Sequence, residues 1–231
     1  MLRMTIWTDI LDLFYPQLCM VCSRTLVTSE THICTFCYDE LPRTGFHFQK
    51  ENPTEKILWG RVPMEQAGSF LFFNKNGMTQ NLLHHIKYRG RKELAQGLGR
   101  MYARELKNEQ PDFRPDLIIP VPLHRRKENQ RGYNQSLSFA EGLSEVLGVP
   151  LLPKAIKRKA HTATQTRKSR YRRWENVANV FSVEQPEALK GRHIAIVDDV
   201  ITTGATLEAC CRPLLEYDVR ITIMTLAIAR G

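Results

Sequence analysis

Long hydrophobic runs are missing from this sequence of 231 residues. No stretch approaches the roughly 20 apolar residues that a membrane-spanning helix needs. The N-terminal residues also lack the apolar core of a secretory signal peptide, because Asp9 and Asp12 interrupt their hydrophobic residues. Apolar residues recur at helical spacing from Ile6 to Phe14, which predicts an amphipathic helix that packs on its own domain or, alternatively, contacts a membrane surface or a partner. We therefore expect a cytoplasmic protein without a transmembrane segment.

Acidic residues are in the minority, and the formal net charge is +9. Such a charge points to polyanionic ligands, either nucleic acid or small molecules rich in phosphate. Acids are absent between Lys154 and Trp174, where nine lysines and arginines lie. The core of this segment, residues 162–174, has little apolar periodicity, so we expect a mobile basic loop that becomes ordered on an anion, with a solvated charge run as the alternative.

Cysteines are few, and four of the six form two CxxC pairs, Cys19 with Cys22 and Cys34 with Cys37. Two such pairs close together have the spacing of a zinc site with four thiolate ligands. Four thiolates fill the tetrahedron and leave no position for a catalytic water, so we expect a structural zinc in a segment too short to bury its own core. Two disulfides, or a redox pair, are the alternatives.

No lysine follows the glycine of T-T-G-A-T, residues 202–206, which disfavours the phosphate loop of a nucleotide triphosphatase. The apolar run at residues 194–197 before it is typical of a parallel strand buried on both faces. We expect this strand to end in Asp198 and Asp199, whose carboxylates can each accept a hydrogen bond from one hydroxyl of a vicinal diol such as that of ribose.

The residues after the two acids combine glycine with hydroxyl groups, immediately before a predicted helix at residues 207–216. Glycine lets the backbone approach a ligand closely, and a helix N-terminus attracts anions. A simple N-capped helix is the alternative, since Asp and Thr both cap well. With the acids, these residues predict a site for ribose 5-phosphate, whose phosphate cradle comprises Thr202, Thr203, Gly204, Ala205 and Thr206.

The remaining pattern alternates strands with helices. We expect strands at residues 69–73, 116–123, 177–183 and 219–229, the last of them closing the sheet, and three helices between residues 77 and 148. Ligands of open parallel sheets gather beyond the carboxyl ends of the strands. The basic residues after strand 116–123, from His124 to Lys127, therefore lie beside the Asp198 loop if the two strands are neighbours, or else form a solvated loop.

Several segments point to one known family when they are taken together. They are the CxxC pairs, P-V-P-L-H at residues 120–124, R-G-Y-N-Q-S at 131–136, T-Q-T-R at 164–167, E-N-V-A-N-V-F at 175–181 and V-D-D-V-I-T-T-G-A-T at 197–206. The chain thereby resembles the ComF family of phosphoribosyltransferase-like proteins over nearly its whole length. The resemblance implies an α/β fold, with a type I phosphoribosyltransferase-like parallel sheet flanked by helices and a small N-terminal zinc-ribbon-like module. We expect an amphipathic helix and zinc module at residues 1–45, a linker at 46–66 and the phosphoribosyltransferase-like domain at 67–231.

The resemblance also implies roles for particular residues. Asp198 and Asp199 would bind the ribose hydroxyls of phosphoribosyl pyrophosphate (PRPP), accompanied by Mg²⁺, and residues 202–206 its 5-phosphate. The family's pyrophosphate loop corresponds to Leu123, His124 and Arg125. Its flexible lid corresponds to the stretch that contains Gln165, Arg167, Lys168, Arg170, Arg172 and Arg173.

Two functions remain open at the level of sequence. Family membership is linked to natural competence, which favours a role in DNA uptake. In this role the protein would bind PRPP, bind single-stranded DNA through its basic loop, and have competence proteins as partners. Few aromatic residues could stack bases there, Tyr171 and Trp174 being the best candidates. The alternative is an active phosphoribosyltransferase, in which Mg²⁺ and basic groups hold the departing pyrophosphate. Its catalytic residues are unknown, because no hood for a nucleobase or amine acceptor is recognisable.

Overall fold

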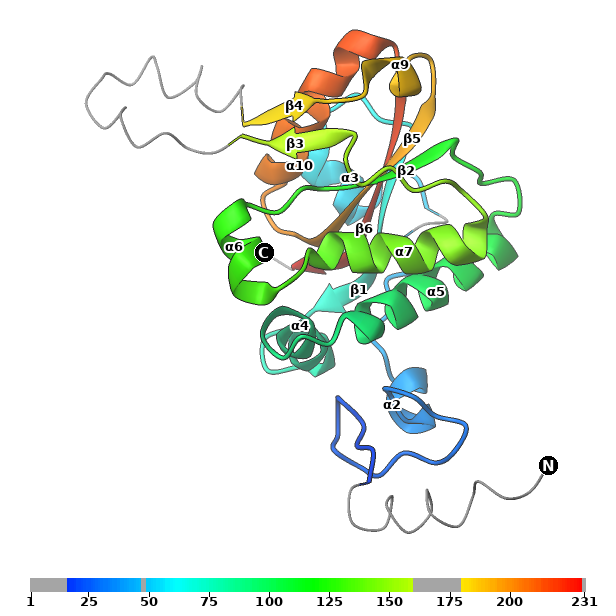
Figure 1. The fold of residues 1–231 in the computed structure, drawn as a ribbon. Coiled ribbons are helices and arrows are strands. Elements are labelled where there is room, and N and C mark those ends of the chain that lie inside the picture. Colours follow the sequence, from blue (N-terminus) through cyan, green and yellow to red (C-terminus); the bar gives the residue numbers. More distant parts are fainter. Residues whose placement is uncertain (1–15, 47–48, 160–179, 230–231) are drawn as a thin grey trace, which may run out of the picture.

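Four parallel strands form the central sheet of the computed structural model, which describes residues 16–46, 49–159 and 180–229 (Figure 1). Their order is β1-β6-β5-β2, with bounds Gln66–Phe73 for β1, Leu117–Pro120 for β2, His193–Ile201 for β5 and Arg220–Ala229 for β6. The sequence suggested that the last strand closes the sheet. β6 instead lies between β1 and β5, where a strand buried along nearly its whole length belongs.

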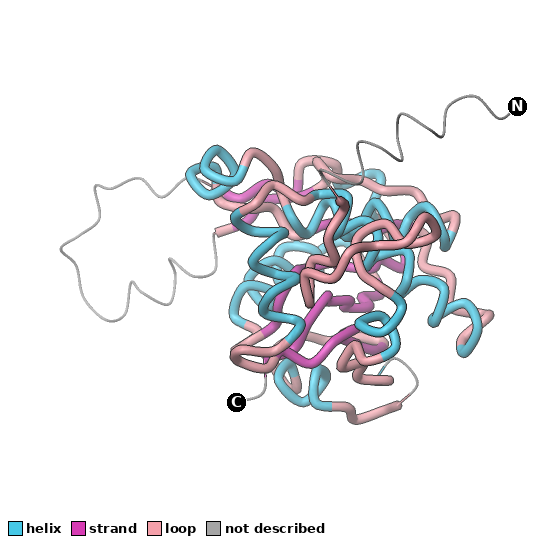
Figure 2. The backbone as a smooth tube through the Cα atoms, turned by 90° about the horizontal axis from the view of Figure 1, so that it is seen from below, coloured by secondary structure: helices cyan, strands magenta, loops and turns pink. Residues whose placement is uncertain are grey.

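Helices cover both faces of this sheet, and Figure 2 shows the strands in the middle of the molecule. On one face, α4 (Met78–Tyr88), α5 (Lys92–Glu109) and α7 (Gln135–Leu147) share a core with Ala195 and Val197 of β5. On the other, α3 (Pro53–Leu58), α9 (Pro186–Leu189) and α10 (Ala205–Cys211) pack with Ile194 and Ile196. Successive side chains of a strand point to opposite faces, so the apolar run is buried on both sides. The predicted α/β class, a parallel sheet flanked by helices, is confirmed.

Two glycines set the close approach of α5 and α7. A Cβ atom on Gly99 would lie 2.2 Å from the carbonyl oxygen of Phe139, and one on Gly142 would lie 2.0 Å from that of Gln96. Any larger side chain at either position would push the helices apart. Because α7 begins at the predicted site, this contact also fixes the position of its first turn.

The predicted helix at residues 207–216 is divided in two. α10 ends at Cys211, and the 3-10 helix η3 (Arg212–Tyr217) continues the chain. Pro213 lies in the first turn of η3. Proline has no N–H to donate and its ring crowds the preceding turn, so the α-helix cannot run through it.

Three smaller elements complete the described structure. They are α2 (Thr35–Asp39), α6 (Arg125–Arg131) and an antiparallel hairpin of β3 (Ile156–Arg158) with β4 (Phe181–Val183). β4 covers the described end of the strand predicted at 177–183, and it pairs with β3 rather than with the central sheet. No helix among the described residues is long and apolar enough to span a bilayer.

The segment predicted as a linker, residues 46–66, contains folded structure. Asn52 begins α3 by accepting hydrogen bonds from the N–H groups of Thr54 (2.8 Å) and Glu55 (3.2 Å), and its side-chain amide donates to the carbonyl of Ala67 on β1 (2.7 Å). Leu58 at the end of α3 is fully buried. This part of the chain is therefore packed on the sheet, while the division into domains stays a prediction.

Candidate functional site

The two predicted acids lie within β5 rather than at its end. β5 continues to Ile201 and remains paired with β6, but β2 stops at Pro120, opposite Val197. Asp198 and Asp199 therefore follow directly where the β2 side of β5 becomes free. β2 and β5 are neighbours, so the loop after β2 and the acids share one end of the sheet, as the sequence analysis required.

Asp198 is almost completely buried, and its Oδ1 atom accepts two hydrogen bonds. The donors are the Ser136 hydroxyl in the first turn of α7 (2.8 Å) and the Asp199 N–H (2.8 Å). No donor from a described residue reaches its Oδ2 atom. Burial, followed by the charge of Asp199, raises the pKa of Asp198 to about 7, against these hydrogen bonds and the nearby Lys87. This carboxyl therefore keeps an acceptor oxygen for a ligand and is ionised less readily than an exposed aspartate.

Asp199 is balanced by a cation from another element. The ammonium group of Lys87, in the last turn of α4, lies 2.9 Å from Asp199 Oδ2, and both side chains are about four-fifths buried, with 21% and 18% exposed. Opposite charges close together at this depth attract more strongly than at the surface. A ligand hydroxyl that takes Asp199 must therefore share it with Lys87 or displace that ammonium.

A hollow of about 160 Å³ opens above the two acids. It combines both carboxylates with cations from three elements, which suits a ligand that carries hydroxyls and phosphates together. Four predicted site residues line it: Leu123, Asp198, Asp199 and Thr206. Lys127, one of the basic residues expected beside the Asp198 loop, also lines it. Five further polar residues that line it were not predicted at this site: Lys87, Arg131, Gln135, Ser136 and Arg158.

The predicted phosphate cradle turns sharply beside the hollow. Gly204 has a φ of +74°, and a Cβ atom there would lie 2.8 Å from a methyl group of Leu58 and 2.9 Å from one of Ile57. Glycine is thus required both for the left-handed backbone and for the approach of α3. Arg61 ties this segment together, because it donates to the Thr203 carbonyl and pairs with Glu208 of α10. Thr202, Thr203, Gly204 and Ala205 adjoin the hollow along the chain without lining it.

The predicted pyrophosphate loop leads into α6. Leu123 lines the hollow, whereas His124 caps α6 through its Nδ1 atom, which accepts from the Arg126 N–H at 3.2 Å, and Arg125 is exposed. Asn134 holds the loop from the other side: its side-chain amide donates to the Val121 carbonyl (3.0 Å), and its oxygen caps α7. The loop after β2 and the start of α7 are therefore positioned as one unit.

Two predicted features lie outside the described residues. They are the basic loop, with Gln165, Arg167, Lys168, Arg170, Arg172 and Arg173, and the amphipathic helix before Pro16. Both remain predictions from the sequence.

The structure gathers the four predicted cysteine ligands. The sulfurs of Cys19, Cys22, Cys34 and Cys37 all lie within 4.8 Å of one another, with Cys22 and Cys34 at 3.7 Å. Zinc–sulfur bonds of about 2.3 Å in a tetrahedron place sulfurs about 3.8 Å apart, so these residues fit the ion. All six cysteines are free thiols, which argues against the disulfide alternative. Burial raises the pKa of the Cys19 thiol, but hydrogen bonds from the N–H groups of Cys22, Cys34 and Val21 outweigh burial and lower this pKa to about 7. The lowered pKa favours the thiolate form that binds a metal.

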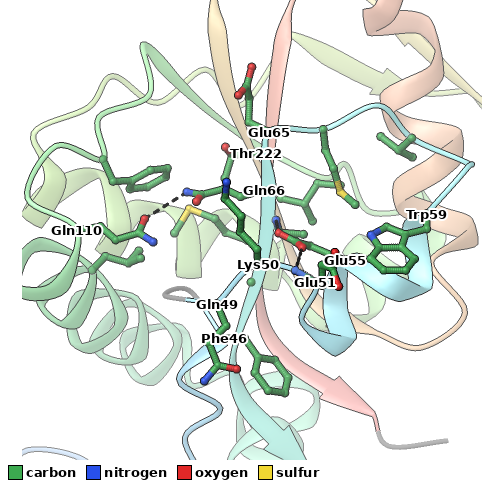
Figure 3. Close-up of a pocket in the computed structure, with 18 of the residues that line it drawn as sticks. Phe46, Gln49, Lys50, Glu51, Glu55, Trp59, Glu65, Gln66, Gln110 and Thr222 are labelled. Carbon is green, nitrogen blue, oxygen red and sulfur yellow. Dashed lines mark hydrogen bonds between the residues drawn. The ribbon is translucent and has the colours of Figure 1, made fainter.

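A larger hollow, of about 640 Å³, lies at the opposite end of the sheet (Figure 3). Its lining comes from α3, α5 and the first residues of β1 and β6, and it includes Lys50, Glu55, Trp59 and Gln66. None of the predicted site residues that the structure describes lines it. The hollow at the paired acids, and not this larger one, therefore contains the residues predicted to bind PRPP.

Comparison with known proteins identifies relatives of the chain. The phosphoribosyl transferase domain family matches residues 134–231, which include α7, β5 and both acids. The DNA utilization protein YhgH of Shigella flexneri is 34% identical over 202 residues, 86% of this chain and 84% of that protein. The competence protein ComFC of Bacillus subtilis is 27% identical over 215 residues, 93% of this chain and 85% of that protein. A crystal structure of adenine phosphoribosyltransferase is 19% identical, with a TM-score of 0.39, over 61% of this chain and 74% of that one.

The two curated relatives match most of the chain, 86% and 93% of it, and most of their own length. Similarity of this length and degree confirms the resemblance that the sequence motifs gave. The chain belongs to the ComF family and has its phosphoribosyltransferase-like fold.

Proposed function

We propose that this protein binds PRPP, or a related phosphorylated ribose, in the hollow above Asp198 and Asp199, and that it acts in the uptake or utilisation of DNA. The observation that carries the ligand is a pair of carboxylates, one with an oxygen that no described donor reaches, beside four cations: Lys87, Lys127, Arg131 and Arg158. A ribose diol needs acceptors, and a pyrophosphate needs charged donors.

The ligand's groups can be assigned to parts of this site. The ribose hydroxyls would donate to Asp198 and Asp199, the 5-phosphate would lie at residues 202–206, and the pyrophosphate would lie between Leu123 and the basic side chains of α6. Carboxylates together with substrate phosphates are the ligands that Mg²⁺ prefers, so the residues of the hollow fit an ion that arrives with PRPP. Such an ion would neutralise charge on the pyrophosphate.

The role in DNA metabolism is supported by the relatives, whose names refer to DNA utilization and competence. We propose that the basic segment contacts single-stranded DNA and that competence proteins are partners. The cytoplasmic location stays a prediction.

Transfer of the ribose phosphate to an acceptor is the second candidate function, favoured by the cations that could hold a departing pyrophosphate. Release of pyrophosphate from PRPP in the presence of a nucleobase or amine would establish it.

The test of PRPP binding is the substitution Asp199→Asn. Loss of a charged acceptor typically costs about 1.5 kcal/mol or more, so affinity for PRPP with Mg²⁺ should fall at least about 12-fold in a calorimetric titration. Asp116→Asn is the matched control, because this carboxylate lies at the opposite ends of β2 and β5, where it accepts from the His193 N–H. Equal affinities of wild type and Asp199→Asn for PRPP would show that the ribose does not bind at Asp199.

A further inference from the structure

An exposed aromatic ring lies beside the hollow. Tyr88 is the last residue of α4, follows Lys87 directly, and has 64% of its surface exposed. The His84 ring, one helical turn earlier, is 5.3 Å from the Tyr88 ring between centroids, and the Arg131 guanidinium carbon is 5.8 Å from the same centroid. Tyr88 belongs to neither hydrophobic core of the sheet.

The residues around this ring tie the end of α4 to the loop before α7 and to the hollow. The Tyr133 hydroxyl donates to the Ile86 carbonyl, which fastens the end of α4 to the loop before α7. Arg131 donates to the Gln135 side chain at 2.8 Å, and Arg131 and Gln135 both line the hollow. Tyr88 therefore lies at the edge of a cationic site, at the fastened end of α4, and most of its surface is open to solvent.

The segments on either side of this ring are rich in cations. Figure 1 shows α4 and α6 next to each other at the end of the sheet. In residues 87–93 and 124–131 only Glu93 and Glu128 are acidic. Against them stand Lys87, Arg89, Arg91, Lys92, Arg125, Arg126, Lys127 and Arg131. Of these, Lys87 alone forms an ion pair with a carboxylate of a described residue.

We propose that Tyr88 is a stacking platform for a base of single-stranded nucleic acid, whose backbone phosphates lie on the cations of α6 and of the turn between α4 and α5. Bases stack on aromatic rings whatever their identity, and a basic surface that follows the backbone supplies the rest of such a site. The cations reach beyond what one phosphate group can use, which favours a strand over a free base. This inference rests on the proposed DNA role and adds to it a site outside the basic segment.

Other exposed aromatic rings provide a matched control. Trp59 is 51% exposed and has the Lys56 ammonium 5.8 Å from its ring, an arrangement similar to Tyr88 with Arg131. Trp59 lines the large hollow at the amino ends of the strands, away from the paired acids. If any exposed ring beside a cation weakened DNA binding when removed, Trp59→Ala would have the same effect as Tyr88→Ala.

The experiment measures binding of a fluorescent oligothymidylate by anisotropy, with full-length wild type, Tyr88→Ala, Tyr88→Phe and Trp59→Ala. Loss of one stacked base weakens binding by between about 5-fold and about 150-fold, so Tyr88→Ala should fall in this range. Tyr88→Phe keeps the ring and should bind nearly as wild type, and Trp59→Ala should be unchanged. Titration with PRPP should give equal affinities for wild type and Tyr88→Ala, which shows that the variant is folded.

A strand without bases separates stacking from charge. Wild type should bind an abasic strand of the same length more weakly than oligothymidylate, and the difference between the two strands should be smaller for Tyr88→Ala; an equal difference in both proteins would contradict stacking on Tyr88. Duplex DNA should show no dependence on Tyr88, because its bases are already stacked.

The outcomes distinguish this inference from the DNA role on which it rests. If wild type binds no strand, the proposed DNA role fails and the platform fails with it. If wild type binds strands and Tyr88→Ala binds them equally well, the platform alone is wrong. If thymidine binds as tightly as the strand and depends on Tyr88, the ring serves a free nucleoside and the proposal is overturned.

Discussion

Asp198 and Asp199 are adjacent in sequence but lie in different electrostatic surroundings. Asp199 has the ammonium of Lys87 beside it, whereas Asp198 is buried with a serine hydroxyl and a backbone N–H as donors. The pKa of Asp198 is raised to about 7, so near neutral pH its carboxyl passes from an acid to a carboxylate. An ionised oxygen is the stronger acceptor for a ribose hydroxyl.

A pH dependence of ligand binding follows from this difference. Ionisation of Asp198 goes from roughly one tenth at pH 6 to nine tenths at pH 8, so its share of PRPP affinity should rise up to about tenfold over that range. The folding stability of the free protein changes with pH in the opposite direction. Because the pKa of Asp198 is raised in the folded state, its ionisation opposes folding, and the stability that this carboxyl contributes falls as the pH rises from about 4 to about 7.

Calorimetric titrations at pH 6, 7 and 8 measure this effect. The variant Asp198→Asn is the control for titration of the phosphates of PRPP. Because it lacks the carboxyl, its affinity for PRPP should change with pH only through those phosphates. Asp116→Asn should behave as wild type. Parallel pH profiles for wild type and Asp198→Asn would show that Asp198 does not titrate in the binding equilibrium.

The sequence identified these acids because they are neighbours in one motif after a buried run. It did not identify Lys87, Ser136 and Arg158, which come from three separate elements and meet the acids only in the folded chain. Ser136 stands in R-G-Y-N-Q-S, and the signal that could have found it is Asn134, a cap that starts α7 beside the end of β2. No comparable feature of the sequence marks Lys87 as a site residue, because it is one of several cations in a basic turn.

At the scale of elements, apolar periodicity predicted most strands and helices, but it did not predict the division of the helix at residues 207–216 or the order of the strands in the sheet. Residues 194–197 predicted a strand buried on both faces because each of their side chains has a core to enter. The position of β6 inside the sheet depends on connections that periodicity does not encode. The fold of residues 52–58 was missed, because prolines that suggested a linker also suit the first turn of a short helix.

The N-terminal module provides the prediction at this scale. Its only described helix, α2, has five residues, and besides Cys19, Cys34 and Cys37 its described part buries few apolar side chains, so a bound metal would contribute much of its stability. We expect one zinc ion per chain, bound by Cys19, Cys22, Cys34 and Cys37. Metal analysis of purified protein should give about one equivalent, and a chelator should lower the midpoint of thermal unfolding.

Variants make this test specific. Cys37→Ser should lose most of the metal, because three thiolates bind zinc less tightly than four. Cys211→Ala is the control: Cys211 is the buried last residue of α10, on the other face of the sheet, so this variant should keep the zinc. Less than half an equivalent of metal, with all four module thiols open to alkylation in reduced protein, would rule the zinc site out.

At the scale of the whole molecule, the positive charge is unevenly distributed. The nine cations between Lys154 and Trp174 equal the net charge of +9, and α6 carries further cations, Arg125, Arg126, Lys127 and Arg131. One pyrophosphate cannot use so many. A polyanion can, because each phosphate that a cation neutralises releases bound counterions from the strand.

The basic segment should therefore determine how DNA binding depends on salt. The affinity for a single strand should fall with salt at a log–log slope of roughly 0.7 per phosphate contact, so neutralising Arg167, Lys168 and Arg170 with glutamine should reduce the slope by about two. A second triple variant, with Lys56, Lys107 and Lys190 changed to glutamine, lowers the net charge equally, from +9 to +6 (9 − 3 = 6), but at exposed positions outside the segment. It should keep nearly the wild-type slope, since overall charge acts weakly across distances longer than the screening length. If all three proteins give the same slope, the segment does not follow a DNA backbone, and slower release of pyrophosphate in the first triple variant would then assign it to the ribose phosphate site.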